Sequence, residues 1–281
     1  MSAYRFCRTD DIGLLVDALN RCWLPYFPDE PPMTTAAFKR SIRDRQVWCS
    51  SCMVAFAGSD PIGVLIGAKR PSGTLVHKIA VHPDHRRQGH GRHMLASLGS
   101  KLAILGPPRI VAEVPETFAA ASGLFSASGF VQETVLTDYV WQGEISDVPR
   151  VDGTFVIPVT VDDLAANGLL GEAHPQTCWE RSVETLTARK DDIAGLAVAS
   201  DERIEAYLLY AMRGAETEII GLRSFIEDGG ARLTQLLARL GSGTFRFPKV
   251  HSSEISMELL QTLGFRPAGG HLLYAARARS A

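Results

Sequence analysis

The sequence has too few cysteines for a disulfide scaffold. There are five in 281 residues, and an odd count leaves at least one thiol unpaired. Cys49 and Cys52 form a C-x-x-C motif, but MVAFAG after it is typical of a strand, whereas a redox motif opens a helix. A structural zinc needs a second closely spaced ligand pair, and Cys7, Cys22 and Cys178 are scattered singly. We expect buried, unreactive thiols and no metal site.

The sequence also lacks long apolar runs and an excess of charge of either sign. No run approaches the ~20 apolar residues that a membrane-spanning helix needs, and the opening MSAYRFCRTDD has no signal-peptide core. Lys and Arg number 29 against 31 Asp and Glu, a net charge of −2. Proteins held to nucleic acid by bulk electrostatics are expected to be basic. We therefore expect a soluble cytoplasmic protein with neither nucleic acid nor membrane as partner.

Length and composition indicate two globular domains. A chain of 281 residues with 46% hydrophobic and 21% charged residues is ordinary for a soluble protein with two domains. The segment QGEISDVPRVDGT combines glycine, proline and aspartate, as linkers do. The net charge is +2 for residues 1–145 and −4 for residues 146–281. We expect domains at 1–145 and 146–281, and the first is the better host for a polyanionic ligand.

The hydrophobic pattern of the first half predicts an α/β domain with a sheet of mixed direction. Strand and helix patterns alternate after two initial helices. The predicted helices cover 11–23, 34–45, 92–105 and a short stretch around 119–129, and the predicted strands cover 53–58, 61–70, 75–81, 109–114 and 134–141.

The second half repeats this order. LAVASDERIEAYLLYAMR echoes MVAFAGSDPIGVLIGAKR, and ARLTQLLARL echoes RHMLASLGSKL. The spacing from Ile62 to Ile79 is 17 positions, and that from Ile204 to Leu222 is 18. Because order and spacing agree, the sequence predicts a duplicated domain rather than two unrelated ones.

A basic segment with two glycines concentrates the chemistry. Between Asp84 and His93 there are three arginines and three histidines against one aspartate. Gly89 and Gly91 stand between a strand-ending proline and a helix, where backbone amides can approach a ligand. The helix dipole and nearby guanidinium groups favour a pyrophosphate there. The alternative is a basic helix cap on the surface.

This segment resembles the cofactor loop of the GNAT acyltransferase superfamily. The shared features are strand, proline, a basic turn with R-x-x-G-x-G at Arg86, Gly89 and Gly91, then helix. LFSASGF at 124–130 is similar to the family's helix ending in Gly-Phe, and the resemblance covers most of residues 3–141. It implies two tandem GNAT-like domains. In the second domain FIEDGG at 225–230 replaces the basic turn, so that domain is expected to be a degenerate copy without a cofactor loop.

The resemblance also implies which residues meet the cosubstrate, acetyl-CoA. The backbone amide near Val81 would stabilise the oxyanion, with Ile79 and Ala80 beside the pantetheine arm. The position of Phe125 also touches the cofactor. The loop residues that would hold the pyrophosphate are Arg86, Arg87, Gln88, Gly89, His90, Gly91 and Arg92.

The resemblance leaves several residues as candidates for the general acid and the general base. Many family members carry a tyrosine general acid where this chain has Phe125, which has no proton to donate. Ser126, Ser128 and Tyr139 are possible substitutes, and Phe125 is otherwise a core aromatic. Glu113 and His82 are candidate bases. Glu113 is otherwise a solvated strand residue, and His82 a loop residue paired with its neighbours.

These features imply an acetyl-CoA-dependent N-acetyltransferase that acts on a small-molecule amine by direct attack, as a monomer or homodimer. The loop RCWLPYFPDEPPM either lines the acceptor site for a cationic amine or fastens itself to the core through its aromatic residues. Trp179, Glu180 and Arg181 in the second half either face the site or belong to an amphipathic helix. The alternative functions are a non-catalytic acyl-CoA-binding or regulatory module, which Phe125 favours, and a structural protein.

Overall fold

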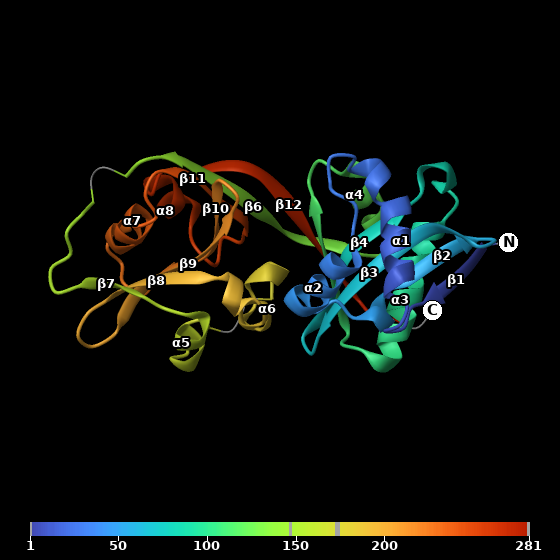
Figure 1. Ribbon diagram of the computed structural model, residues 1–281, viewed down its shortest axis with the longest axis horizontal. Helices are drawn as coiled ribbons and strands as arrows, with labels where there is room; N and C mark the ends of the chain where they lie inside the picture. Colours follow the sequence, from blue (N-terminus) through green and yellow to red (C-terminus); the bar gives the residue numbers. More distant parts are fainter. Residues whose placement is uncertain (1, 146–147, 172–174, 280–281) are drawn as a thin grey trace. The chain divides into compact units, whose positions relative to one another are not determined.

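The computed structural model describes residues 2–145, 148–171 and 175–279. The chain divides into two compact units (Figure 1). The first unit comprises Met1–Thr134 and Leu272–Ala281, and the second comprises Val135–His271. Each unit is a mixed α/β sheet with helices, as the sequence predicts.

The first unit contains the predicted helices and the first four predicted strands. The fifth, predicted at 134–141, lies in β6 (Val131–Gly143), which belongs mostly to the second unit. The first unit also has a strand, β1, that is too short and too near the amino terminus to give a pattern. The elements in chain order are β1 (Ser2–Phe6), α1 (Ile12–Cys22), η1 (Leu24–Tyr26), α2 (Thr35–Arg45), η2 (Cys49–Ser51), β2 (Met53–Ala57), β3 (Asp60–Arg70), β4 (Gly73–Val81), η3 (Pro83–His85), α3 (His90–Leu105), β5 (Arg109–Pro115), α4 (Ala119–Ala127) and the start of β6 (Val131–Gly143).

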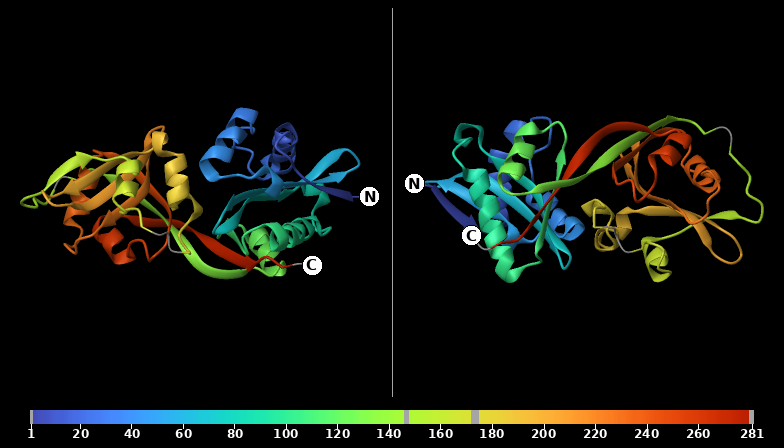
Figure 2. Two further views of the ribbon diagram at one scale, coloured as in Figure 1. Left: turned by 90° about the horizontal axis from the view of Figure 1, so that it is seen from below. Right: turned by 180° about the vertical axis from the view of Figure 1, so that it is seen from behind.

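The sheet of the first unit separates two layers of helices. Its strand order is β1-β2-β3-β4-β5-β12. Helices α1 and α2 lie on one face, and α3 lies on the other (Figure 2). Leu15 and Leu19 are buried on α1, which packs on β3. On the opposite face, Met94 and Leu98 of α3 and Phe125 of α4 belong to one core cluster. Helical spacing of apolar residues therefore predicts which side of each helix meets the sheet.

The two central strands of the first unit separate after a short ladder. In the described part of the chain, β4 and β5 pair in parallel only at Thr74–Leu75 and Ile110–Val111. The remainder of β4 stays paired with β3 on its other side, apart from a register shift between Ile66 and Gly67. We call residues 78–81 the unpaired segment of β4, because no ladder joins them to β5, although β3 pairs with their other side.

The second unit repeats the plan of the first. Its strand order is β6-β11-β10-β9-β8-β7, and β10 and β11 also pair in parallel over a few residues only, 216–218 with 244–246. The elements are β7 (Phe155–Pro158), α5 (Val161–Ala166), η4 (Trp179–Arg181), α6 (Val183–Ala188), η5 (Lys190–Asp192), β8 (Ala194–Ala199), β9 (Ile204–Arg213), β10 (Glu216–Ser224), α7 (Ala231–Ala238), β11 (Gly243–Val250), α8 (Met257–Thr262) and β12 (Arg266–Arg277).

Two strands belong to both units. The division falls between Thr134 and Val135 within β6, and again between His271 and Leu272 within β12. Tyr274 of β12 is buried in the core of the first unit, and Trp141 of β6 in that of the second. The sequence instead placed one boundary after residue 145, in a linker whose residues 146–147 lie outside the described ranges. Turn composition marks a loop, but it cannot reveal that a strand continues into another unit.

All five cysteines are buried, and none forms a disulfide. Burial raises the pKa of Cys7 to about 12 and that of Cys22 to about 11. Cys49 and Cys52 flank a single 3-10 turn that leads into β2. Burial also raises the pKa of both of these thiols. Thiolates are the reactive form, so these side chains are unreactive packing residues, as the sequence predicts.

Among the residues that the structure describes, no helix has the length and apolar composition needed to span a membrane.

Candidate functional site

The loop between β4 and α3 presents backbone amides at the start of a helix. Arg87 has φ +64° and Gly89 has φ +88°, so both adopt the left-handed region. Gly89 is the N-cap of α3, and His93 N donates to Gly89 O at 3.0 Å. A helix leaves the amides of its first turn without intrahelical partners, and here they belong to the three residues after Gly89. Together with the helix dipole they favour an anion.

The two glycines of the motif are needed for different reasons. A Cβ on Gly89 would meet nothing within 4 Å, so space is no obstacle, but its φ of +88° strains any L side chain. A Cβ on Gly91 would lie 3.1 and 3.2 Å from the methyl groups of Leu124 on α4. Gly89 therefore shapes the loop, and Gly91 allows α3 to approach α4 closely.

His90 supports this loop from inside the first unit. Its side chain is buried, and its Nδ1 lies 2.6 Å from the Tyr4 hydroxyl. The Tyr4 ring also lies 3.8 Å from the ring of His93. Burial, aided by the charges of neighbouring histidines, lowers the pKa of His90. The predicted contact of His90 with a ligand is therefore restricted to its backbone amide. Tyr4 lies on β1, so sequence reasoning missed this support.

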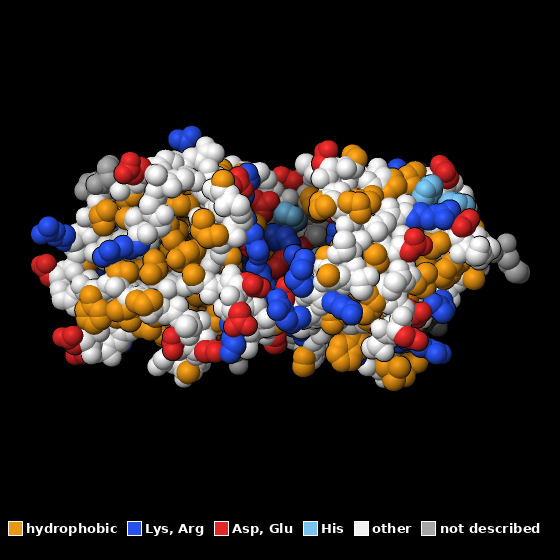
Figure 3. All heavy atoms as spheres, in the orientation of Figure 1, with side chains coloured by type: hydrophobic (Ala, Val, Ile, Leu, Met, Phe, Trp, Pro, Cys, Tyr) orange, Lys and Arg blue, Asp and Glu red, His pale blue; other side chains and the backbone are white. Residues whose placement is uncertain are grey.

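The basic side chains of the loop lie at the surface. Arg86, Arg87, Gln88 and Arg92 are all exposed. In Figure 3, histidine and Lys or Arg side chains gather on the part of the first unit where the loop between β4 and α3 lies in Figure 1. Exposed guanidinium groups next to unpaired helix amides can make charge-assisted bonds to phosphate oxygens.

The unpaired segment of β4 directs backbone groups away from β3. His82 N donates to Ile62 O at 2.9 Å, so Val81 and its partner on β3 form a pair that exchanges no hydrogen bonds. The N–H and C=O of Val81 therefore point to the side where β5 has diverged. Ile79 has the same orientation because the pattern repeats every two residues. Ala80 points its backbone groups toward β3, so its amide is engaged in the sheet.

The two candidate bases lie in different surroundings. Glu113 is half-buried on β5. Ile110, Ala112 and Val114 face the core under α3, so alternation puts Glu113 on the opposite sheet face. His82 follows β4, and its Nδ1 accepts a bond from Asp84 N at 3.4 Å. His82 thus caps the turn after β4, as its alternative interpretation holds.

Phe125 lies in the core. It is 2% exposed, its ring centroid lies 5.1 Å from that of Phe130, and it stacks on Tyr274 at 5.8 Å. Of the predicted substitutes for a tyrosine acid, Ser128 donates to Leu124 O at 2.8 Å and Tyr139 is buried in the core of the second unit. Ser126 is exposed on α4.

The loop after α1 is fastened through its aromatic residues. Trp23 and Phe27 stack at 4.4 Å, and Phe27 contacts Phe118 at 5.4 Å. The Trp23 indole donates to Glu30 at 3.1 Å. The ammonium of Lys78 lies 3.9 Å from the Trp23 ring and 3.5 Å from Glu30. Burial lowers the pKa of Lys78 although Glu30 opposes the shift. These contacts fasten the loop to the unit and leave Glu30 partly exposed beside an aromatic surface. Packing on the core and lining an acceptor site are therefore compatible roles for this loop.

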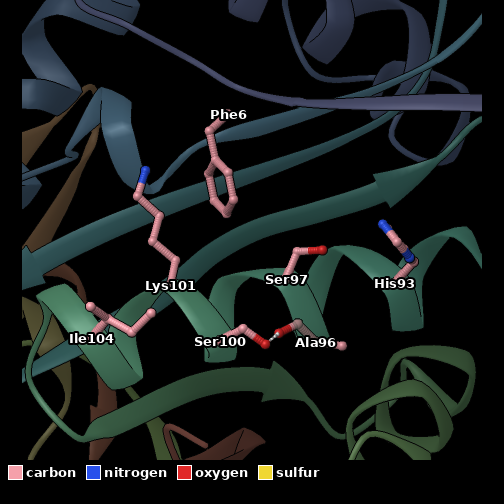
Figure 4. Close-up of a pocket in the computed structure, with 7 residues that line it drawn as sticks. All are labelled: Phe6, His93, Ala96, Ser97, Ser100, Lys101 and Ile104. Atoms are coloured by element: carbon pink, nitrogen blue, oxygen red, sulfur yellow. Dashed lines mark hydrogen bonds between the residues drawn. The ribbon is translucent and has the colours of Figure 1, made fainter. Parts of the chain in front are cut away.

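A shallow groove of about 480 Å³ runs along the outer side of α3 (Figure 4). Lys101 is one of its lining residues. The Lys101 ammonium lies 4.0 Å from the centre of the Phe6 ring and donates to Ser50 O at 2.5 Å. The groove is mostly apolar and lies beside β1, away from the unpaired segment of β4. Its lining residues are Phe6, His93, Ala96, Ser97, Ser100, Lys101 and Ile104.

The second unit uses its own carboxylate at the matching helix. Gly230 is the N-cap of α7 with φ +92°, as Gly89 is for α3. Asp228 accepts bonds from Gly230 N and Arg232 N, both at 3.0 Å, and from the Arg232 guanidinium at 2.8 Å. Arg232 also binds Glu205 at 2.7 Å. Asp228 thus bonds the amides of Gly230 and Arg232, two of those that could meet a phosphate.

Replacing Asp228 with asparagine should lower stability in a pH-dependent way. Burial raises the pKa of Asp228, but bonds from Arg232 and Gly230 more than offset this, so the net shift is downward. A carboxyl group whose pKa is lowered by folding stabilises the folded state at pH values above its unfolded pKa of about 3.9. This contribution is lost as the pH falls through the lower pKa of the folded state. Thermal unfolding should show a deficit of about 1 kcal/mol at pH 6, shrinking below about pH 4. An equal deficit at pH 3 and pH 6 would contradict a role for the charge.

Comparisons with known proteins agree with this geometry. Residues 48–132 match the acetyltransferase (GNAT) domain family. The matched region contains β4, the loop to α3, β5 and α4. A search of curated proteins finds no match.

Solved structures share the fold over the whole chain. A tandem GNAT protein from the clavulanic acid biosynthesis pathway has 16% identity and a TM-score of 0.68, with 100% of this chain and 99% of that chain covered. A GCN5-related N-acetyltransferase from Sphaerobacter thermophilus has 14% identity and a TM-score of 0.68, with 99% and 96% covered. One from Anabaena variabilis has 11% identity and a TM-score of 0.67, with 99% and 73% covered.

The TM-scores of these structures show a shared fold, and the family match lies in the first half of the sequence. The chain therefore has the fold of tandem GNAT proteins, and its residues 48–132 match the GNAT acetyltransferase domain family.

Proposed function

We propose that this chain transfers an acetyl group from acetyl-CoA to the primary amine of a small molecule. The family match supports acetyltransferase activity in general. One observation supports the finer proposal. The unpaired segment of β4 has no ladder to β5, and the loop after it leads to helix amides, following Gly89, that have no intrahelical partner. An extended thioester with a charged diphosphate at one end suits this combination.

The residues present fit acetyl-CoA. The amides after Gly89 would hold the pyrophosphate, with Arg86, Arg87 and Arg92 supplying positive charge and Gln88 a further donor. The backbone groups of Ile79 that point away from β3 would bond the pantetheine arm. Acetyl-CoA supplies the acyl group as a thioester. Binding would therefore use main-chain groups mostly, so it depends on the backbone conformation.

The chemistry needs an oxyanion donor and a base. The N–H of Val81 would stabilise the negative charge that develops on the carbonyl oxygen, since it has no strand partner on that side. An alkylamine has a pKa near ~10, so it must lose a proton before it attacks. Glu113 and His82 remain the candidate bases. Glu113 lies on the same sheet face as the loop after α1, which would contribute the acceptor side.

The acceptor would be a small amine with an apolar body. Trp23 and Phe27 supply aromatic surface, and Glu30 has a partly exposed carboxylate that attracts an ammonium. Lys78 already lies against both Trp23 and Glu30, so an ammonium would compete with it or bind Glu30 from the exposed side.

The second unit would not bind the cosubstrate. Asp228 occupies the helix amides of α7 and repels a diphosphate. We therefore assign acetyl-CoA binding to the first domain, predicted at residues 1–145, and treat the domain predicted at 146–281 as a degenerate copy. Binding should accordingly saturate at one acetyl-CoA per chain.

Calorimetry and thiol detection test the function. The full chain is titrated with acetyl-CoA and with desulfo-CoA, and we expect one site for each. Free thiol is then measured with acetyl-CoA and a panel of putrescine, tyramine, glucosamine and lysine. We expect release above the water background with at least one amine, and mass spectrometry should find its N-acetyl product. An absence of both binding and thiol release would refute the proposal.

The burial of Phe125 favours a second candidate function, a non-catalytic acyl-CoA-binding or regulatory module. A core aromatic at this position cannot protonate a leaving thiolate. This candidate predicts the same calorimetric binding, but no thiol release with any amine at any pH between 6 and 9. The two assays together therefore separate the candidates.

A further inference from the structure

The proposed reaction requires a proton source that Phe125 does not provide. As the amine nitrogen bonds to the carbonyl carbon, the carbon–sulfur bond breaks and its electron pair leaves with sulfur. The amine loses one proton to a base, and the thiolate takes one from an acid. A thiol pKa near ~8.5 makes the thiolate a fair leaving group, so the step can occur without an acid and is faster with one.

Tyr26 places a phenol at the unpaired segment of β4. Its hydroxyl donates to the Val81 carbonyl at 2.7 Å. Because this carbonyl points away from β3, the hydroxyl lies on the side of β4 where the ladder to β5 is missing. The residue is 38% exposed, so the phenol is open to a molecule that binds there.

The surroundings fix the position of Tyr26. It ends η1, where Tyr26 N donates to Trp23 O at 3.0 Å and Phe27 N donates to Leu24 O at 2.9 Å. The stacking of Trp23 on Phe27 fastens the turn on both sides of Tyr26. The phenol is thus held on a short, packed turn rather than on a free loop.

The Tyr26 phenol keeps its proton, and Arg86 is the group that favours its ionised form. Burial raises the pKa of Tyr26, and Arg86 partly opposes the shift, so the phenol is protonated at neutral pH. The Arg86 guanidinium carbon lies 5.7 Å from the centre of the ring. It can stabilise a phenolate formed for a short time, and it belongs to the loop that would hold the pyrophosphate. The other substitutes are less well placed, since Ser128 is bonded to α4 and Tyr139 belongs to the second unit.

We propose that Tyr26 is the general acid of the reaction. Its hydroxyl exchanges the bond to the Val81 carbonyl for one to the departing sulfur, and it donates its proton to the thiolate. The phenolate is then reprotonated by solvent or by the base that received the amine proton. This inference rests on the proposed function, because it concerns the same site and the same thioester.

The test uses Tyr26→Phe in the full chain, with acetyl-CoA and the fastest amine of the panel. We expect kcat to fall about a hundredfold, while the calorimetric Kd for acetyl-CoA changes less than threefold. Tyr210→Phe removes a tyrosine hydroxyl from β9 in the second unit and should leave kcat unchanged. A Tyr26→Phe variant that keeps kcat within threefold of wild type would overturn the inference.

A second measurement separates proton donation from a structural role. An acid must be protonated, so wild-type kcat should fall as pH rises through the phenol pKa. Replacing Tyr26 with 3-fluorotyrosine, which is more acidic, should move that alkaline fall to lower pH. An unmoved profile would overturn the inference. If wild type releases no thiol with any amine, the proposed function itself fails, which is a different result from an active Tyr26→Phe variant.

Discussion

Gly89→Val should abolish measurable binding of acetyl-CoA. Gly89 has φ +88°, and a Cβ there would meet nothing within 4 Å, so the effect is conformational rather than steric. A β-branched residue in the left-handed region carries strain of about 1–3 kcal/mol. The loop can relieve this strain only by rotating the amides at the start of α3, and those amides are the proposed pyrophosphate donors. Calorimetry of the full chain with acetyl-CoA measures the loss.

A matched control separates the loss of the site from the loss of stability. Gly58, in the turn between β2 and β3, has φ +61° and also has nothing within 4 Å of a built Cβ. Gly58→Val therefore introduces similar strain in the same unit without touching the loop. It should lower the unfolding temperature by a similar amount and keep acetyl-CoA binding. Wild-type affinity in Gly89→Val would remove the basis for assigning this loop to the diphosphate.

The sequence predicts the loop because its signal is local. A strand-ending proline, two glycines and an apolar helix pattern lie within about 20 consecutive residues, and each reflects backbone conformation or helix formation directly. The structure accordingly has α3 at His90–Leu105 with Gly89 as its N-cap. The cap of α2 by Thr34 is equally local, with its side chain accepting from Ala37 N at 3.1 Å.

Features that depend on distant pairing could not be predicted. β1 is five residues long, and its role in holding His90 through Tyr4 joins positions 86 apart. The bond from Tyr26 to Val81 joins positions 55 apart. The passage of β6 and β12 between units has no compositional signal, because a strand that leaves one core enters another and stays apolar.

Residue type alone could not decide between the alternative roles of the site residues. Phe125 is apolar, so it fits a core and a cofactor surface equally, and only burial against Tyr274 distinguishes them. The sequence predicts a second half in which FIEDGG stands in place of the basic turn. That Asp228 bonds the helix amides itself depends on a turn geometry that this segment does not specify.

Arg181→Ala should destabilise the second unit by about 3–5 kcal/mol, because it removes a buried guanidinium and leaves the half-buried Glu254 carboxylate without its ion-pair partner. Arg181 is only 6% exposed; its Nε lies 2.5 Å from Glu254, and a second nitrogen donates to Glu254 at 3.1 Å. It also donates to the carbonyls of Pro248 and Lys249 on β11. At about 2–4 °C per kcal/mol, calorimetry should show the unfolding transition of this unit shifted by roughly 10 °C.

The exposed pair Arg246–Glu216 is the matched control. Arg246 also binds its partner through two nitrogens, at 2.5 and 2.9 Å, but the two side chains are 56% and 40% exposed. Arg246→Ala should therefore cost less than about 1 kcal/mol. Equal shifts for the two variants would mean that burial of the Arg181 pair contributes nothing.

The position of Arg181 gives this prediction a functional consequence. The carbonyls of Pro248 and Lys249 lie on β11 after its ladder with β10 ends at Glu218 and Arg246, which corresponds to the separation of β4 and β5 in the first unit. The second unit thus bonds its own guanidinium to β11 where the two strands separate. In the first unit the N–H of Val81, on the other strand of the matching pair, points into the separation. A large loss of stability in Arg181→Ala, without any gain of acetyl-CoA binding, would assign Arg181 a structural role at this separation. A second acetyl-CoA site in that variant would instead mean that Asp228 alone does not exclude the cosubstrate.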